Sequence, residues 1–259
     1  MQFIISAATW DTALQGDMRQ DELPALAVNL GCKGVEFRPY WHDIGLELPE
    51  SKRLLARYGL TATYACSEAL LGQTMEEVQM SLAAMVDSIN IAYLLDAPVL
   101  RIYVANGPFR SEFLRHEWWK KAVESLIGLA AEKNIVLAVE NQPDPEAGNP
   151  ALIKSILDIF ASTHFRLAFD TGNWLMAKQK PSAAFAQLEE YIGYVHLKDM
   201  IPVEGTYEPS YLGVGAVEVM DLMSRILKSG YRGPLVLEFP GGEDPEEKVR
   251  ASLDYLYGK

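Results

Sequence analysis

Short runs rich in β-branched residues alternate with longer amphipathic stretches along the whole 259-residue chain. The runs predict strands at Phe3–Thr9, Gly34–Arg38, Leu60–Ala65, Val99–Val104, Ile135–Glu140, Arg166–Asp170, Gly193–Lys198 and Leu235–Phe239. The stretches between them predict helices at Asp21–Leu30, Glu50–Tyr58, Thr74–Leu95, Glu112–Glu132, Pro150–Ala161, Pro181–Glu190, Ala216–Lys228 and Pro245–Tyr257. Strict alternation of this kind indicates parallel strands that are joined by helical crossovers.

The number of these units narrows the fold class further. Eight strand–helix units in roughly 250 residues favour a closed (β/α)₈ barrel over an open sheet. Ferredoxin-like and doubly wound folds stay open as alternatives, although they do not use eight units so evenly. No linker, low-complexity run or break in composition interrupts the pattern, so we expect one domain over residues 1–259.

Composition and charge limit the partners. The net charge is −12, and this acidic excess argues against a nucleic acid or an anionic membrane as partner, because both require a basic surface. The two cysteines, Cys32 and Cys66, form no CxxC motif. The N-terminal residues lack a basic region followed by a long apolar run, and no apolar run is long enough to span a bilayer. The cytoplasm is the expected compartment.

Polar side chains of the later predicted strands share one face of each strand. Side chains alternate between the two faces of a strand, and in a barrel one face packs on the helices while the other fills the interior. The continuous apolar face must meet the helices, so the polar side chains must point inward. Four of them lie at the C-terminal ends of their strands, where barrel enzymes place their chemistry: Glu140, Asp170, His196 and Glu238.

These four side chains together predict a metal site. A single acidic residue at a strand end more often forms a salt bridge or caps a helix. Four side chains that all point into the barrel at the same end favour a shared cation instead. Buried charges without partners would cost several kcal/mol each. Three carboxylates and one imidazole suit one hard divalent ion, Mn²⁺ first or Mg²⁺, and the imidazole also admits Co²⁺ or Zn²⁺.

Basic side chains on inward phases are candidates for holding a substrate. Three carboxylates overcompensate the two charges of the ion, so the site needs further cations. Lys198, Arg101 and Arg38 are placed to stabilise an enediolate or to bind a carboxylate or phosphate of the substrate. For Arg101 and Arg38, a salt bridge inside the barrel with Glu36 as partner is an alternative of equal weight.

Aromatic residues near the predicted mouth of the barrel are candidates for stacking on a sugar ring. They are Trp10, Tyr64, Tyr103 and Trp174. Plain packing is an equally common role for aromatic residues at the start of loops. Trp10 and Trp174 are the preferred candidates, and Tyr103 shares the inward phase of Arg101.

Several short motifs recur in a fixed order. They are Gly34-Val35-Glu36-Phe37-Arg38, Val139-Glu140-Asn141, Phe169-Asp170-Thr171-Gly172-Asn173-Trp174, Val195-His196-Leu197-Lys198-Asp199, Gly213-Val214-Gly215 and Leu237-Glu238-Phe239-Pro240-Gly241. In this order and spacing, over essentially the whole chain, they resemble the xylose isomerase-like TIM-barrel superfamily of sugar isomerases and epimerases. The runs Asp170–Trp174 and Gly193–His196 are most similar to the epimerases of bacterial 2-ketogluconate utilisation clusters.

The resemblance implies roles for individual residues. Glu140, Asp170, His196 and Glu238 would be the metal ligands, and the two glutamates would also be the acid/base pair. The implied reaction is proton abstraction next to a carbonyl, through an enediolate, in a small sugar, a keto-sugar acid or a sugar phosphate. Relatives of this kind also imply a homodimer.

Other family positions differ in part. Ketose 3-epimerases of the superfamily often carry a second glutamate six residues after the first, and Glu146 has that spacing. Asn173 stands where they carry a histidine, and Asn141 joins it among the substrate-binding candidates. Their substrate-binding arginine is not evident, because Pro202 lies near its place, and Lys198 is available instead. These departures leave the predicted metal site intact but put the substrate in doubt.

Three rival functions stay open on the sequence. A metal-dependent sugar or cyclitol dehydratase would use the same metal and the same proton abstraction but expel a hydroxyl group. An abasic-site endonuclease is disfavoured, because that activity uses a histidine-rich zinc cluster and a basic surface, whereas this chain has four histidines and a net charge of −12. A catalytically inactive sugar-binding barrel is disfavoured because both candidate acid/base glutamates are present.

Overall fold

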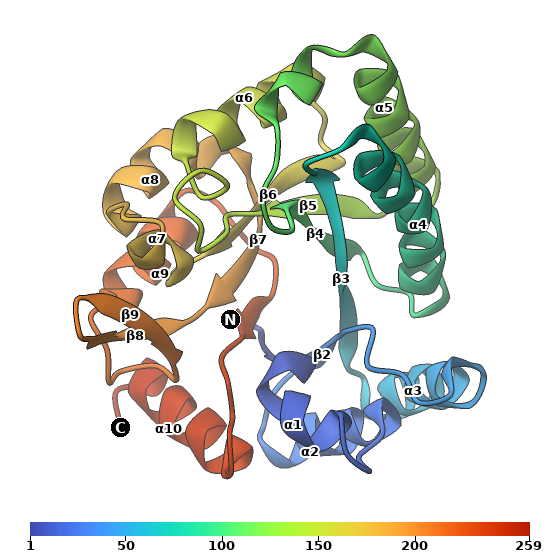
Figure 1. Ribbon diagram of the computed structural model, residues 1–259. Helices are drawn as coiled ribbons and strands as arrows, with labels where there is room; N and C mark the ends of the chain where they lie inside the picture. The colour runs from blue at the N-terminus through green and yellow to red at the C-terminus, as the bar shows by residue number, and fades with distance from the viewer.

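Eight parallel strands close into a barrel in the computed structural model, which describes all residues from 1 to 259 (Figure 1). The strands are β1 (Phe3–Ser6), β2 (Gly34–Phe37), β3 (Thr61–Leu71), β4 (Val99–Ala105), β5 (Val136–Glu140), β6 (Phe165–Asp170), β7 (Ile192–Leu197) and β10 (Leu235–Leu237). They pair in that order around the ring, and β10 pairs back with β1. The predicted (β/α)₈ barrel is confirmed.

Helices surround the barrel on the outside (Figure 1). The long ones are α2 (Leu23–Asn29), α3 (Ile44–Tyr58), α4 (Met75–Leu94), α5 (Glu117–Glu132), α6 (Pro150–Phe160), α8 (Pro181–Leu188), α9 (Val219–Lys228) and α10 (Pro245–Tyr257). Each overlaps a predicted helical stretch, and all but α3 lie within theirs. The predicted start of α3 at Glu50 was wrong, because the Asp43 carboxylate caps the backbone N–H groups of Gly45 and Leu46 and the helix continues through Pro49.

The interior of the barrel has an apolar layer beneath a charged one. The apolar layer is a separate buried cluster made of Ile4, Val99, Ala138, Ala168, Tyr194 and Val236. On the opposite strand faces, residues such as Leu100, Leu137 and Leu197 belong to the large core between sheet and helices. The predicted separation of an apolar helix-facing side from a polar inward side is therefore confirmed.

Strand β1 is shorter than predicted. It ends at Ser6 rather than Thr9, because the Ser6 hydroxyl accepts a hydrogen bond from the Ala8 N–H at 3.2 Å and a 3₁₀ turn follows over Ala7–Trp10. A short helix, α1 (Asp11–Leu14), comes next.

Strand β3 is longer than predicted and irregular. Ala65 pairs with Arg101 and Ala69 with Tyr103, so three residues of β3 lie opposite a single residue of β4. The Cys66 carbonyl in this bulge accepts a hydrogen bond of 2.7 Å from Arg101 Nη1. Bulges of this kind re-aim side chains next to functional sites, and here the bulge provides an acceptor for a buried guanidinium.

An antiparallel hairpin that the sequence analysis did not predict follows β7. Its strands are β8 (Asp199–Val203) and β9 (Thr206–Ser210), joined by Glu204 and Gly205, which both have positive φ angles. A two-residue turn with two positive φ angles matches the twist of a hairpin. The hairpin packs beside α7 (Asn173–Met176), where Gly172 leaves room for Met200 because a Cβ at Gly172 would lie 2.9 Å from the Met200 side chain.

One carboxylate closes the base of this insertion. Asp199 is buried, and its two oxygens accept hydrogen bonds from the backbone N–H groups of Met200, Gly213, Gly215 and Val217 at 2.8–3.0 Å. Both ends of the hairpin segment are thereby joined to a single side chain. No helix of the structure is both long enough and apolar enough to cross a membrane.

Replacing Asp199 with alanine should destabilise the protein measurably. Hydrogen bonds to a charged group contribute about 1.5–3 kcal/mol each. Water can replace the carboxylate at some of the freed backbone N–H groups, so we expect a total loss of about 2–4 kcal/mol. Urea denaturation would measure it. The matched control, Asp221→Ala, removes an exposed partner of Arg225 on α9 and should change stability by less than about 0.5 kcal/mol. Equal losses in both variants would contradict the closing role of Asp199.

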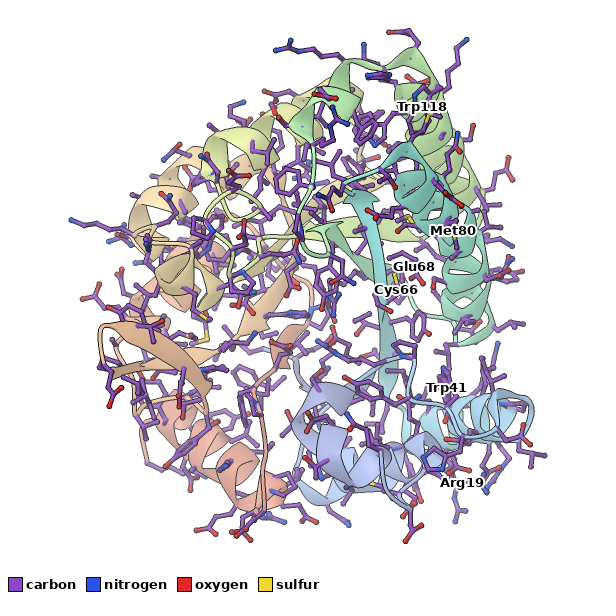
Figure 2. All side chains as sticks on the ribbon, viewed as in Figure 1. Arg19, Trp41, Cys66, Glu68, Met80 and Trp118 are labelled. Atoms are coloured by element: carbon purple, nitrogen blue, oxygen red, sulfur yellow. The ribbon has the colours of Figure 1, made fainter.

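Both thiols should be unreactive in the folded protein. Burial raises the pKa of Cys32 to about 12 and raises that of Cys66, which lies on β3 (Figure 2), still further. Thiols of the unfolded chain ionise near pH 8.5. The stability gained by keeping both thiols neutral and buried is therefore fully present below that pH, and it is lost as the pH rises from there through their raised pKa values. Neither cysteine should react with a disulfide reagent at about pH 8, and both should react in denaturant. Rapid labelling of the native protein would contradict this expectation.

Candidate metal centre at the mouth of the barrel

The four predicted ligands meet at one end of the barrel. Glu140 and Asp170 are the last residues of β5 and β6, His196 lies near the end of β7, and Glu238 follows β10 directly. One potential ligand atom from each side chain lies within 4.8 Å of all the others. All four side chains are buried. The structure therefore brings together the residues that the strand phases placed at a common site, and their binding of a metal stays a prediction.

The donor set fits a divalent ion. Donor atoms bonded at about 2.1 Å lie up to about 4.2 Å apart across an ion, so a small inward movement would complete the coordination. Two buried oxygens, Asp170 Oδ2 and Glu238 Oε2, accept no hydrogen bond of suitable geometry. The Lys198 ammonium forms ion pairs with both, at 3.0 Å from Asp170 Oδ2. Such oxygens are suited to binding a cation.

His196 is held between two carboxylates. Its Nδ1 lies 2.6 Å from Glu140 Oε1, and its Nε2 lies 2.7 Å from Glu36 Oε2. Burial would lower the pKa of an imidazole, but the charges and hydrogen bonds of Glu36 and Glu140 outweigh burial and raise the pKa of His196 to about 10. The imidazole therefore carries a proton on both nitrogens at neutral pH, and a divalent ion bound at Nδ1 would have to displace one of them.

The carboxylates at the site differ in their affinity for protons. Burial, together with nearby Glu238 and Glu140, raises the pKa of Asp170 to about 6, although Lys198 opposes the shift. Burial would also raise the pKa of Glu140, but Arg101 and His196 hold it below its usual value. For Glu238, Lys198 and Arg38 overcome burial in the same way. Both candidate acid/base glutamates are thus ionised at neutral pH.

The predicted cations are paired at the site. Arg38 Nη2 lies 2.8 Å from Glu238 Oε1 and 3.3 Å from Glu36 Oε1. Arg101 Nε lies 3.5 Å from Glu140 Oε2, and its guanidinium carbon lies 4.1 Å from the centre of the Tyr103 ring. The alternative of salt bridges inside the barrel, with Glu36 as a partner of Arg38, therefore describes these contacts. The same guanidinium groups also border the cluster of predicted metal ligands.

Two asparagines support Asp170. The Asn141 side chain accepts a hydrogen bond from the Asp170 N–H at 2.8 Å and donates one to the Asp170 carbonyl at 3.1 Å. Asn173 donates to the Asn141 carbonyl at 3.0 Å, and its Oδ1 lies 3.4 Å from Lys198 Nζ. Both residues were predicted to bind substrate. The structure shows them in these positioning contacts, and only Asn173 is partly open to solvent, at 6%.

The remaining predicted contacts differ in exposure. Tyr103 is half-buried at the mouth, and Glu146 is exposed on the loop after β5, beside a hollow of about 520 Å³ that the loop after β4 also lines. Trp10 is buried, and Trp174 is fully buried against Phe169 with ring centres 5.4 Å apart. The preference for Trp174 as a sugar-stacking residue is therefore not supported, because its ring has no exposed face.

Glu36 is a site residue whose main contact the sequence analysis missed. Its inward phase was recognised, but only as a salt-bridge partner for arginine. Its shortest ionic contact is instead with His196 on the far side of the ring. Strand phase alone could not reveal this pair, because β2 and β7 are neighbours only across the barrel interior, with β1 and β10 between them in the ring.

Comparisons with known proteins agree with this fold. A curated relative from Haemophilus influenzae, SgbU, provisionally assigned as an L-ribulose-5-phosphate 3-epimerase, is 26% identical over 126 residues, which are 47% of this chain and 44% of that protein. The match thus spans less than half the length of that relative.

Solved structures match over almost the whole chain. D-psicose 3-epimerase of Clostridium cellulolyticum H10, solved with D-tagatose, has a TM-score of 0.77 at 15% identity and covers 100% of this chain and 99% of its own. The probable 3-DHS dehydratase AsbF of Bacillus anthracis has a TM-score of 0.77 at 13% identity and covers 99% of each chain. At these identities the likeness concerns the fold alone. The model of the xylose isomerase-like TIM barrel family matches residues 24–259, and the chain belongs to this family.

Proposed function

We propose that this chain is a divalent-metal-dependent sugar epimerase or isomerase, which moves a proton on a carbon next to a carbonyl group. The observation that carries the proposal is the buried cluster of Glu140, Asp170, His196 and Glu238 with two ionised glutamates at one end of the barrel. Family membership and the epimerase names of relatives support the same reaction class.

These four side chains would hold the ion, with manganese as the first expectation. When bound, a divalent ion polarises a carbonyl group and stabilises negative charge on its oxygen, which makes the neighbouring C–H group more acidic. The chain's own contribution is to hold the donors in place. Asn141 fixes the backbone of Asp170, and Glu36 fixes the ring of His196.

We infer that the two glutamates transfer protons on opposite faces of the substrate. Glu140 ends β5 and Glu238 follows β10, and β6 and β7 lie between these strands in the ring. One carboxylate can take a proton from one face of the substrate carbon, and the other can return a proton to the opposite face. Arg101 beside Glu140, and Arg38 and Lys198 beside Glu238, keep both groups ionised for this work.

The charge balance favours an anionic substrate. Glu36, Glu140, Asp170 and Glu238 face Arg38, Arg101 and Lys198, so a bound dication with a neutral His196 leaves one positive charge without a partner. A carboxylate or phosphate on the sugar would compensate it, and Lys198 and Arg38 line the cluster where such a group could bind. A keto-sugar acid or a sugar phosphate therefore fits better than a neutral sugar.

Glu140→Gln and Glu238→Gln should each abolish turnover without unfolding the protein. Positioned acid/base groups contribute about 10²–10⁴-fold to rate, and a neutral amide cannot transfer the proton. Steady-state rates and circular dichroism would be compared with Glu124→Gln, which changes an exposed glutamate on α5 and should keep the wild-type rate. A wild-type rate in either site variant would rule out the acid/base role.

Removing divalent ions should eliminate activity and lower thermal stability. Chelation followed by addition of Mn²⁺ should restore both, and at a hundredfold excess over the dissociation constant the ion would stabilise the fold by about 2.7 kcal/mol. Asp170→Asn should lose the Mn²⁺-dependent shift in melting temperature. Full activity after exhaustive chelation would contradict the proposed metal dependence.

Incubation with substrate panels in D₂O tests the reaction class. Mn²⁺-loaded protein would be incubated with neutral keto-sugars, keto-aldonic acids and sugar phosphates, and products would be examined by mass and by stereochemistry. Epimerisation or isomerisation keeps the mass apart from deuterium uptake at one carbon, whereas dehydration loses water. Loss of water would replace the proposed function by the dehydratase reaction. A preference for keto-aldonic acids or sugar phosphates would support an anionic substrate, and a preference for neutral keto-sugars would contradict it.

A further inference from the structure

We propose that Glu36 is a positioning residue, whose carboxylate selects the ring nitrogen that His196 offers to the metal. The inference rests on the proposed metal site. It adds a fifth residue, from a strand on the far side of the barrel, to the four candidate ligands. Glu36 would not touch the ion or the substrate.

The carboxylate of Glu36 is completely buried and fully engaged. Oε1 accepts a hydrogen bond from the Ser6 hydroxyl at 2.7 Å and faces Arg38 Nη2 at 3.3 Å. Oε2 accepts from the Tyr194 hydroxyl at 2.8 Å and faces His196 Nε2 at 2.7 Å. A carboxylate with this many partners cannot turn without breaking several contacts, so its direction toward His196 is fixed.

The contact determines where the imidazole proton resides. An ionised carboxylate can only accept hydrogen bonds, so the nitrogen that faces Glu36 must carry a proton. By the same rule Nδ1, which faces the ionised Glu140, carries a proton as well, and a divalent ion would have to displace that proton to bind the Nδ1 lone pair, while Glu36 keeps the proton on Nε2 in place. Nδ1 is the nitrogen that points to the other candidate ligands, 2.6 Å from Glu140 Oε1 and 4.0 Å from Asp170 Oδ2. The geometry thus presents the correct nitrogen to a metal ion.

The same carboxylate also reaches a second ligand indirectly. Arg38 contacts both Glu36 and Glu238 through Nη2, so Glu36 supports His196 directly and Glu238 through one guanidinium. Histidines that bind metals commonly donate their second N–H to a carboxylate, and removal of that partner typically weakens metal affinity 10–100-fold. We expect an effect of this size here.

Glu36→Gln tests the proposal with Mn²⁺ as the probe. Free Mn²⁺ measured by electron paramagnetic resonance gives the dissociation constant of each variant. Glu36→Gln should bind Mn²⁺ about 10–100-fold more weakly than wild type, and Glu36→Asp should recover part of that loss because it keeps the charge. Tyr194→Phe is the matched control: it removes the other hydrogen bond to Oε2 but keeps the contact with His196, so its Mn²⁺ affinity should stay within about threefold of wild type if the contact with His196 carries the effect.

The outcomes separate the inference from the proposed function. Wild-type protein that binds no Mn²⁺ would remove the proposed function itself. Wild-type protein that binds Mn²⁺ while Glu36→Gln binds it equally well would overturn only the role of Glu36, even if that variant melts at a lower temperature. Should Glu36→Gln fail to fold, nitrogen NMR of wild-type His196 in the Mg²⁺-loaded protein decides: a proton on Nδ1 instead of Nε2 would overturn the inference.

Discussion

Four carboxylates and three permanently cationic side chains are buried together at one end of the barrel, and the arrangement of the site follows from their mutual compensation. A buried charge without a partner would cost several kcal/mol, and the loss of one partner leaves the other uncompensated. Arg38 joins Glu36 to Glu238, and Lys198 joins Glu238 to Asp170. The cluster is therefore a single electrostatic unit that no strand could contribute alone.

The layer beneath the charges makes this unit possible. The apolar cluster that includes Ile4, Ala138 and Val236 closes the lower part of the barrel, and the small alanines leave room for the Tyr194 ring. Tyr194 belongs to this layer, but its hydroxyl bonds to Thr63 and Glu36 at the level of the charges. The apolar layer offers the carboxylates no polar partner from below, so their pKa values are set by burial and by the neighbouring side chains of the charged layer.

Much of the fold could be predicted because it depends on periodicity. Strand phase separated the helix-facing side chains from the inward ones, and it placed Glu140, Asp170, His196 and Glu238 at a common end. Local hydrogen bonds that override periodicity were not predicted. The Ser6 hydroxyl ends β1 early, the Asp43 carboxylate starts α3 early, and Glu204-Gly205 forms a hairpin turn. Contacts across the barrel were also missed, because the pair of Glu36 with His196 depends on closure of the ring and not on neighbouring strands.

The hairpin after β7 is an addition to the barrel that forms a sheet of its own. Asp199 gathers the backbone on both sides of the excursion, and the excursion contributes no strand to the ring. Its length and tip sequence are thus uncoupled from the closure of the cylinder and from the start of α9. Changes in its largely exposed tip, residues 201–206, would therefore leave the cylinder and the charged cluster intact, whereas Leu212 at its far end belongs to the core and donates its N–H to Ser252. The single aspartate thus marks where the excursion leaves the cylinder and where it returns to it.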